Sequence, residues 1–157
     1  MPTKSILLVE DNPDDRELMK LAFAQGEITH NLIVVSDGIE ALDYLQRHDR
    51  NRNSEAEGDF SLAGMPSLIM LDLNLPKING IEVLRRIRAS PRIRLLPVVI
   101  ISSSNERRDL IDSYINGCYS YIRQPIHFTQ LQNFVKEIST YWLTVNQLPP
   151  VFGVLNE

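Results

Sequence analysis

Five short, mostly apolar runs recur along the chain, and turn-forming or polar residues bound each of them. They span Ser5–Val9, Leu32–Val35, Ser67–Leu71, Pro97–Ile101 and Tyr119–Ile122. Runs of this length and composition are typical of strands that are buried on both faces of a parallel sheet. The pattern therefore predicts five strands in one buried sheet.

A stripe of apolar residues with helical spacing follows each run. The stripes lie within Leu18–Phe23, Ala41–Leu45, Val83–Ile87, Leu110–Ile115 and Leu131–Trp142. Residues three and four positions apart share one face of a helix, so each stripe predicts an amphipathic helix. Five strand–helix pairs in succession predict an α/β fold, with a doubly wound parallel sheet that has helices on both faces.

One stretch between the predicted elements is unusually polar. Arg47–Gly64 is rich in charged residues, asparagine, serine and glycine. Such composition is typical of loops, and we interpret this stretch as an enlarged surface loop.

Composition and charge narrow the possible functions. The 157 residues suit one compact domain, and the hydrophobic share of 43% is ordinary for a globular protein. A net charge of −4 argues against general affinity for nucleic acid, and no apolar run approaches the roughly 20 residues that span a bilayer. The first residues lack the apolar core of a signal peptide, and the single cysteine, Cys118, excludes an internal disulfide framework. We expect a cytoplasmic protein that binds neither nucleic acid nor membrane.

Carboxylates stand directly after two of the predicted strands. Glu10 and Asp11 follow the first strand, and Asp72 follows the third. In an open parallel sheet, ligands bind at the carboxyl ends of the strands, where the strand order reverses. Three carboxylates that converge there repel one another unless a cation lies among them, and oxygen-rich sites of this kind suit Mg²⁺. The sequence therefore predicts a divalent-metal site formed by these three residues.

Two further acids in the same stretch, VEDNPDD, are interpreted differently. Asp14 and Asp15 lie at the start of the first predicted helix, where the helix macrodipole favours acidic side chains. Asp11 could act as a helix cap in the same way. However, Asp11 follows a buried strand closely, as Asp72 does, and this position favours the metal site.

Four motifs, in this order, resemble the receiver domain of two-component response regulators: ILLVEDNPDD, LIMLDLNLPKINGIEVL, LPVVIISSS and YIRQP. The resemblance covers residues 4–140 and leaves 141–157 as a C-terminal extension. It implies a flavodoxin-like fold with strand order 2-1-3-4-5. The enlarged loop before the third strand and the aromatic tail are similar to those of the single-domain regulators paired with bacterial and cyanobacterial phytochromes.

The resemblance also implies a function, that of a phosphoacceptor rather than an enzyme. Asp72 would attack a phosphohistidine on a sensor histidine kinase and become an acyl phosphate. Glu10, Asp11 and Asp72 would hold Mg²⁺ together with the backbone carbonyl of Asn74. The metal would offset charge on the transferring phosphoryl group. The phosphorylated protein would then signal through contacts with a downstream protein.

Further positions match the family by their place in the motifs. Ser102 matches the hydroxyl residue that turns toward the phosphate, and Tyr121 matches the aromatic residue that swings inward with it. Either residue could instead have a purely structural role, as a strand-end cap or a half-buried aromatic. The loops beside the site contain Pro76, Gly80 and Pro125, and we expect Gly80 to supply a backbone geometry that a side chain would obstruct.

One position departs from the family pattern. The family has a lysine just before the proline that follows the fifth strand, and this chain has Gln124 there. Arg123 is adjacent, but alternation along a strand predicts that it points to the opposite face. Glutamine donates only a neutral hydrogen bond, which is weaker than a charge-assisted one by on the order of 1 kcal/mol. Weaker phosphorylation, or looser coupling to the switch, is expected.

Three other functions share features with the phosphorylated switch. A phosphorylation-independent interaction protein with the receiver fold is favoured by Gln124 and disfavoured by the intact set of Asp11, Asp72 and Ser102. A metal-dependent phosphatase would carry a second acid two residues after the nucleophile, where this chain has Asn74. A nucleotide-binding domain would carry a glycine-rich loop after the first strand, and none is present.

The end of the chain predicts a homodimer. Tyr141–Leu143 and Val151–Leu155 carry more apolar surface than a finished five-helix domain needs, and Pro149–Pro150 would hold the intervening chain extended. Contiguous exposed apolar surface usually marks an interface. We therefore expect a symmetric dimer through the last helix and the tail. The alternative is a tail that packs on its own subunit.

Overall fold

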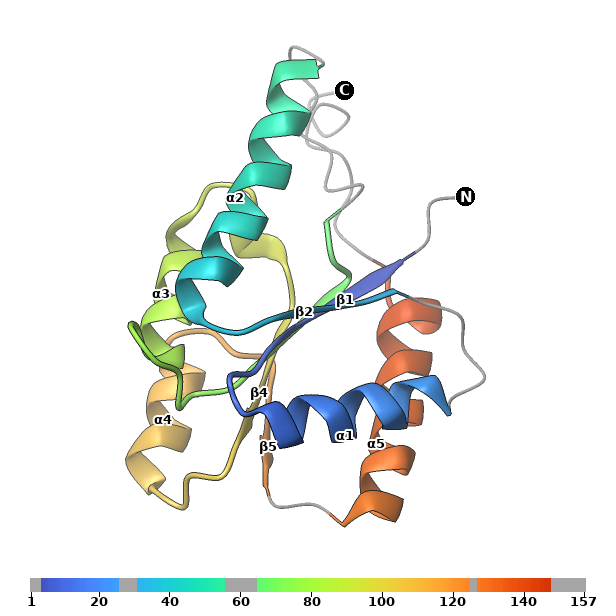
Figure 1. The fold of residues 1–157 in the computed structure, drawn as a ribbon. Helices are drawn as coiled ribbons and strands as arrows, with labels where there is room; N and C mark the ends of the chain where they lie inside the picture. The colour runs from blue at the N-terminus through green and yellow to red at the C-terminus, as the bar shows by residue number, and fades with distance from the viewer. Residues whose placement is uncertain (1–3, 26–30, 56–64, 125–126, 148–157) are drawn as a thin grey trace.

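The computed structural model describes residues 4–25, 31–55, 65–124 and 127–147. It contains five strands: β1 (Ser5–Val9), β2 (Asn31–Val35), β3 (Leu68–Leu71), β4 (Val98–Ser102) and β5 (Ser120–Arg123). All neighbouring strands pair in parallel, and their order across the sheet is β2-β1-β3-β4-β5. Figure 1 shows the strands between two layers of helices. The predicted doubly wound sheet and its strand order are confirmed.

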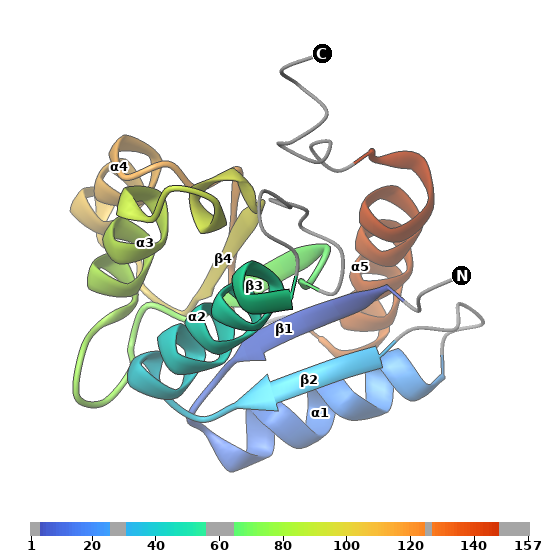
Figure 2. The same ribbon diagram turned by 90° about the horizontal axis from the view of Figure 1, so that it is seen from above.

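Helices cover both faces of this sheet. The first face carries α1 (Pro13–Ala24) and α5 (Phe128–Thr140), and a short π-helical segment, Tyr141–Val145, continues α5. The second face carries α2 (Gly38–Glu55), α3 (Gly80–Ala89) and α4 (Arg107–Ile115), with a short 3-10 helix at Ile93–Leu95 before β4 (Figure 2). No helix among the described residues is long and apolar enough to cross a membrane.

The strands divide their side chains between two hydrophobic cores. In β1, Ile6 and Leu8 pack with the α1 and α5 side, whereas Leu7 and Val9 pack with the α2 and α3 side. All four side chains are at most 3% exposed. Because both faces are covered, the strand sequences are continuously apolar and not alternating. The two cores hold the carboxyl ends of the central strands in fixed register, and those ends carry the predicted chemistry.

The predicted loop at Arg47–Gly64 is wrong for its first half. Helix α2 extends to Glu55, and Figure 1 shows it projecting past the edge of the sheet. Its first turns carry the buried Ala41, Leu42 and Leu45. Once these turns have nucleated the helix, each further residue adds a hydrogen bond without needing an apolar stripe. Residues 56–64 lie outside the described residues.

Helix α4 forms where the sequence predicts it, but its apolar stripe does not face the sheet. Ile111, Tyr114 and Ile115 are 46%, 52% and 75% exposed, and the helix buries Ser113 instead. The neighbouring strand β5 lies at the edge of the sheet and is itself only half-buried. An edge strand covers less of a helix than a central strand does. The result is an exposed apolar surface on α4.

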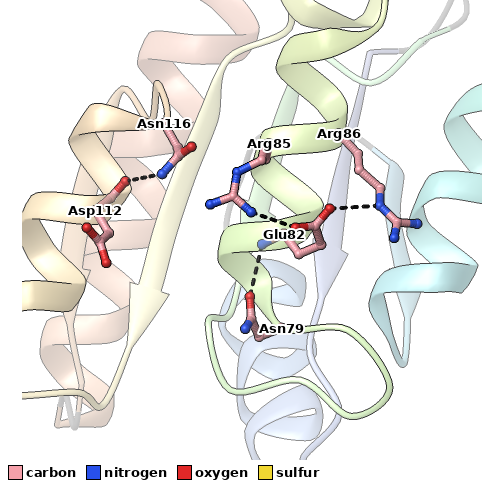
Figure 3. Close-up of polar contacts among 6 residues, drawn as sticks. All are labelled: Asn79, Glu82, Arg85, Arg86, Asp112 and Asn116. Atoms are coloured by element: carbon pink, nitrogen blue, oxygen red, sulfur yellow. Dashed lines mark hydrogen bonds and ion pairs between the residues drawn. The ribbon is translucent and has the colours of Figure 1, made fainter.

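Helix α3 begins with a well-defined cap directly after the loop that follows β3. The side chain of Asn79 accepts a hydrogen bond from the Glu82 backbone N–H at 2.9 Å. Glu82 also accepts from Arg85 Nη1 at 2.6 Å and from Arg86 Nε at 3.0 Å (Figure 3). These exposed ion pairs each stabilise the helix by roughly a few tenths of a kcal/mol, so the Asn79 cap contributes most to fixing where the loop ends and α3 begins.

The C-terminal end of α4 has a side-chain contact of its own. Asn116 Nδ2 donates to the Asp112 backbone carbonyl at 2.8 Å (Figure 3).

Candidate functional site

The site lies at the topological switch point of the sheet, where the strand order reverses. Strand β1 pairs with β2 on one side and with β3 on the other, so a crevice opens at the carboxyl ends of β1 and β3. Val9 and Leu71 are paired in register, and Glu10 and Asp72 follow them. The Asp72 N–H donates to the Val9 carbonyl at 3.1 Å, and the Glu10 N–H donates to the Val35 carbonyl at 3.1 Å. The backbone of both acids is therefore fixed by the sheet.

The three predicted acids meet in this crevice. Carboxylate oxygens of Glu10, Asp11 and Asp72 all lie within 4.8 Å of one another. Glu10 is buried, Asp72 is half-buried and Asp11 is exposed, so the cluster faces outward on one side. An all-oxygen donor set with one open side fits Mg²⁺, which keeps several waters and takes one or two protein carboxylates. Asn74, whose carbonyl is the predicted fourth donor, lines the same pocket.

Burial and mutual repulsion change the pKa values of two acids in this cluster. Burial, together with the charge of Asp72 and a hydrogen bond to it, raises the pKa of Glu10 to about 8. Burial also raises the pKa of Asp72, although hydrogen bonds from Glu10 and from the Asn74 N–H favour its charged form. The two carboxyl groups thus share a proton near neutral pH. A bound cation would replace this proton.

We expect Mg²⁺ affinity to rise with pH up to about 8, the pKa of Glu10. Near pH 7 the proton on this pair should lower the apparent affinity by about tenfold relative to pH 9. Isothermal titration calorimetry in buffers of different ionisation enthalpy measures the released proton. A flat affinity between pH 6 and 8 would contradict the shared proton.

The same group predicts how the metal-free protein responds to pH. Glu10 has an ordinary pKa of 4.5 and a folded pKa of about 8. Between these values the folded state holds a proton that the unfolded state has lost. The proton held by Glu10 therefore contributes fully to the free energy of unfolding below pH 4.5. This contribution is lost as the pH rises toward 8.

The acids line an open pocket of about 510 Å³. Its other walls come from α1, from Leu131 of α5 and from the ends of β3, β4 and β5, and they include Pro13, Leu18, Asn74, Ser103 and Gln124. None of the described residues that line it is a lysine or an arginine.

The start of α1 holds one residue that the sequence reading missed. Asn12 is the N-cap, and its side chain accepts hydrogen bonds from the Asp14 N–H at 2.9 Å and the Asp15 N–H at 3.1 Å. An asparagine before a proline at the first helical position was the available clue. Asp14 and Asp15 lie in the first turn, as predicted, but Asp15 also lines the pocket and raises the pKa of Glu10 further.

Ser102 and its neighbour occupy different environments. Ser102 is fully buried at the end of β4, and its Oγ accepts a hydrogen bond from the Ser104 N–H at 3.1 Å. Ser103 is the residue that lines the pocket. The Ser104 hydroxyl donates to Asp109 of α4 at 2.6 Å. Any turn of the Ser102 hydroxyl toward the pocket would therefore break its contact with the loop that leads to α4.

Tyr121 lies on the α2 and α3 side of the sheet. Its side chain packs against that hydrophobic core, and none of the described residues accepts a hydrogen bond from its buried hydroxyl. It pairs in register with Ile100, two residues before Ser102 on the neighbouring strand.

Strand β5 ends at Arg123, one residue beyond the predicted end at Ile122. Gln124 lines the pocket, and its backbone N–H donates to the Ser102 carbonyl at 2.8 Å. Arg123 is exposed and does not line the pocket. Alternation along the strand therefore separates this cation from the acids, as expected. Pro125 lies outside the described residues.

The loop after β3 closes tightly over the end of the strand. The Gly80 N–H donates to the Leu73 carbonyl at 2.9 Å. A Cβ at Gly80 would stand 2.4 Å from the Asp72 carbonyl oxygen and 2.6 Å from the Leu73 Cα. The absence of a side chain here permits a close backbone approach, in line with the sequence argument. Pro76 is exposed in the same loop.

Comparison with known proteins places these features in one family. The sequence profile of the response regulator receiver domain matches residues 6–136. FilR2 of Methanothrix harundinacea, a probable methanogenesis regulatory protein, is 39% identical over 144 residues, which cover 92% of this chain and 86% of FilR2. Response regulator Rcp1 of Synechocystis sp. is 35% identical over 148 residues, which cover 94% of this chain and 95% of Rcp1.

Solved structures agree with the sequence relatives. The phosphorylated cyanobacterial phytochrome response regulator RcpA has a TM-score of 0.77 at 39% identity, and the match covers 94% of this chain and 99% of RcpA. The Mn²⁺-bound form of Rcp1 has a TM-score of 0.75 at 35% identity, and the match covers 93% of this chain and 99% of Rcp1. One of these relatives thus carries a divalent metal, and another carries a phosphoryl group.

Proposed function

Because this chain belongs to the response regulator receiver domain family, we propose that it accepts a phosphoryl group on Asp72 from a sensor histidine kinase and signals by a change of conformation. One observation carries the proposal: Glu10, Asp11 and Asp72 converge within 4.8 Å at the mouth of an open pocket. Asp72 is the central candidate because it follows β3 directly and has its backbone fixed by β1.

The chemistry requires little of the protein beyond position and charge. An Asp72 carboxylate oxygen attacks the phosphorus of a phosphohistidine, and the P–N bond breaks as the P–O bond forms. The electron pair of the broken bond stays on the imidazole, which takes up a proton. Mg²⁺ held by Glu10, Asp11 and Asp72 would supply positive charge beside the transferring oxygens. The protein is a phosphoacceptor in this proposal, and slow hydrolysis of the acyl phosphate would reset it.

Incubation with acetyl phosphate tests the function without the kinase. We expect one phosphoryl group per chain by intact-mass spectrometry in the presence of Mg²⁺, and none when EDTA removes the metal. A wild-type protein that gains no phosphoryl group with saturating Mg²⁺ would contradict the proposal. That result would favour the second candidate, an interaction protein that uses the receiver fold without phosphorylation.

The kinase is proposed to be a phytochrome, on the strength of the RcpA likeness. FilR2, a probable methanogenesis regulatory protein, has the same sequence identity to this chain. Phosphotransfer assays with a purified phytochrome kinase and with an unrelated histidine kinase would show which kind of kinase is the partner. Faster transfer from the phytochrome kinase is the expected result.

Gln124 is the observation that favours the second candidate, because the described lining of the pocket contains no lysine or arginine. We expect Gln124→Lys to raise the yield of the phosphorylated protein several-fold, since it places a cation beside a group that carries nearly two negative charges. Phos-tag gels after acetyl phosphate treatment measure the yield and the lifetime. Gln130→Lys adds the same charge on the exposed side of α5 and serves as the control. No difference between the two variants would contradict a role for position 124.

We also propose that the protein forms a homodimer through α5 and the C-terminal tail. Tyr141 and Val145 are 50% and 61% exposed at the end of the helical segment that continues α5. Trp142 packs against Tyr119 and Tyr141, with ring centroids 5.9 Å and 5.0 Å away, and the three residues form an aromatic cluster there. Aromatic residues are enriched in interface cores. The tail, residues 148–157, lies outside the described residues.

Light scattering tests the dimer. The full chain should be a dimer at tens of micromolar (roughly 10–50 μM), and a truncation after Val145 should be largely monomeric because it lacks the apolar tail. A truncation at this point leaves α5 and its continuation intact. A monomeric full chain, or a truncated chain that dimerises equally well, would contradict the tail-mediated contact.

A further inference from the structure

Arg16 binds the back of the loop that carries two of the acids. Its Nη1 donates to the carbonyls of Glu10 and Asp11, each at 3.2 Å, and to Ser36 Oγ at 3.1 Å. The guanidinium is half-buried and contacts the backbone rather than the carboxylates. It therefore fixes the orientation of the two peptide units that aim Glu10 and Asp11 into the pocket.

Lys77 holds the other acidic loop in a similar way. Its Nζ lies 3.0 Å from Asp37 Oδ2, and the Asp37 side chain is only 14% exposed. Lys77 has a φ of +68°, in the left-handed region that residues other than glycine rarely adopt. Such a conformation persists when surrounding contacts hold it. The ion pair is one such contact, and it acts on the loop that runs from Asp72 to Gly80.

Ser36 and Asp37, which receive these two cations, form a single rigid turn between β2 and α2. The Ser36 N–H donates to Glu40 Oε2 at 3.1 Å, and the Glu40 N–H donates to Asp37 Oδ1 at 2.8 Å. The N–H of Ala41 donates to the Asp37 carbonyl at 3.1 Å. Hydrogen bonds from the Glu40 backbone N–H and from Lys77 lower the pKa of the Asp37 carboxyl, so its charge is present at neutral pH.

We propose that the Ser36–Asp37 turn is a brace for the cation site, which it positions through Arg16 on the Glu10–Asp11 side and through Lys77 on the Asp72 side. The inference rests on the proposed function, because it concerns the same three carboxylates. Arg16 and Lys77 are positioning residues and touch neither metal nor substrate. The brace acts by holding repelling carboxylates at the spacing that a divalent cation needs, as outer contacts of metal ligands commonly do.

The Mg²⁺ affinity of variants distinguishes a positioning role of Arg16 and Lys77 from an effect of their charge alone. Removing a positive charge near a cation site should tighten Mg²⁺ binding if charge alone matters. Removing a positioning contact should weaken it. We therefore expect Arg16→Gln to weaken Mg²⁺ binding by about tenfold and Lys77→Gln by about threefold, since the Asp37 pair is partly exposed. Arg16→Lys should recover part of the loss.

A matched control lies on the same helix as Arg16. Lys20 pairs with Glu17 at 3.5 Å on the exposed face of α1. Lys20→Gln removes the same charge without touching either loop, and its Mg²⁺ affinity should be unchanged or slightly tighter. In a double-mutant cycle, Asp37→Asn combined with Lys77→Gln should lose no more affinity than Lys77→Gln alone, because the two residues act as one contact.

Amide hydrogen exchange gives a readout without metal. The Asn12 N–H donates to Glu10 Oε2 at 3.2 Å, and the Asn74 N–H donates to Asp72 Oδ1 at 3.1 Å. These two amides report the positions of the carboxylates. Arg16→Gln should speed exchange at Asn12, and Lys77→Gln should speed it at Asn74, while urea denaturation shows that each variant remains folded.

The outcomes separate the brace from the proposed function. Wild-type protein that binds Mg²⁺, with Arg16→Gln and Lys77→Gln binding it equally or more tightly, would overturn the brace alone. Wild-type protein that binds no Mg²⁺ at millimolar concentration would overturn the metal-dependent function together with the brace. Weaker binding in both variants, with Lys20→Gln unaffected, supports the brace.

Discussion

Asp72→Asn should lower phosphorylation by acetyl phosphate to background, a loss of at least about 100-fold, because the substitution removes the attacking carboxylate. An amide is a poor nucleophile. Glu10 is 5% exposed and Asp11 lies on the open side of the cluster. Intact-mass spectrometry after acetyl phosphate treatment measures the yield. Asp14→Asn, at an exposed position in the first turn of α1, should be phosphorylated normally and serves as the control.

The same substitution should also change the metal-free protein. Burial raises the pKa of Asp72 and makes its charge costly. An uncharged asparagine removes that cost and can donate a hydrogen bond to Glu10, so the free energy of unfolding without Mg²⁺ should rise. Urea denaturation with and without Mg²⁺ should show a smaller metal-dependent gain for the variant. Full phosphorylation of Asp72→Asn would mean that another residue is the acceptor.

The sheet was predictable from the sequence because it is buried on both faces. Strand β1 illustrates the point: Ser5–Val9 is continuously apolar in sequence and buried throughout in the structure. The acids that end β1 and β3 were predictable for a related reason. Parallel strands bring their carboxyl ends to one edge, so Glu10 and Asp72 had to meet once their strands were adjacent.

The helices were harder to predict where packing does not decide the pattern. The end of α2 has no apolar stripe, so it read as a loop although the helix continues to Glu55. The apolar stripe of α4 correctly predicted a helix. Ile115 on this helix is nevertheless 75% exposed, because the neighbouring edge strand β5 buries little of it. Apolar periodicity shows that a helix can bury one face, and the neighbouring elements decide whether it does.

The supporting contacts of the site could not be read from spacing at all. Arg16 meets Ser36, and Lys77 meets Asp37 from 40 positions away in sequence. Arg16 lies on α1 and Lys77 in the loop after β3, and each reaches its partner only once the strands have set the register. Asn12 was different, since an asparagine before a proline at a helix start is a local pattern that sequence reading could have used.

Gly80→Ala should destabilise the protein by about 3 kcal/mol, because the new Cβ would overlap backbone atoms and not movable side chains. Its nearest neighbours would be the Asp72 carbonyl oxygen at 2.4 Å and the Leu73 Cα at 2.6 Å. The usual gain of alanine over glycine in a helix, about 1 kcal/mol, is too small to offset this overlap. Relief would require the start of α3 and the backbone at Asp72 to move apart, which should also lower Mg²⁺ affinity and phosphorylation yield.

Gly38→Ala is the matched control for this prediction, since it lies at the start of α2 and its Cβ would also meet neighbours closely. There the contacts are side-chain atoms, Val83 Cγ2 at 2.4 Å and Ile78 Cγ1 at 2.9 Å, and not backbone atoms. Val83 is fully buried and stiff at χ1, so we expect Gly38→Ala to cost about 2 kcal/mol, less than Gly80→Ala. Urea denaturation of both variants and acetyl phosphate labelling of Gly80→Ala measure these effects. If Gly80→Ala costs no more than Gly38→Ala, or keeps full phosphorylation, then the close approach of Gly80 to Asp72 does not position the acceptor.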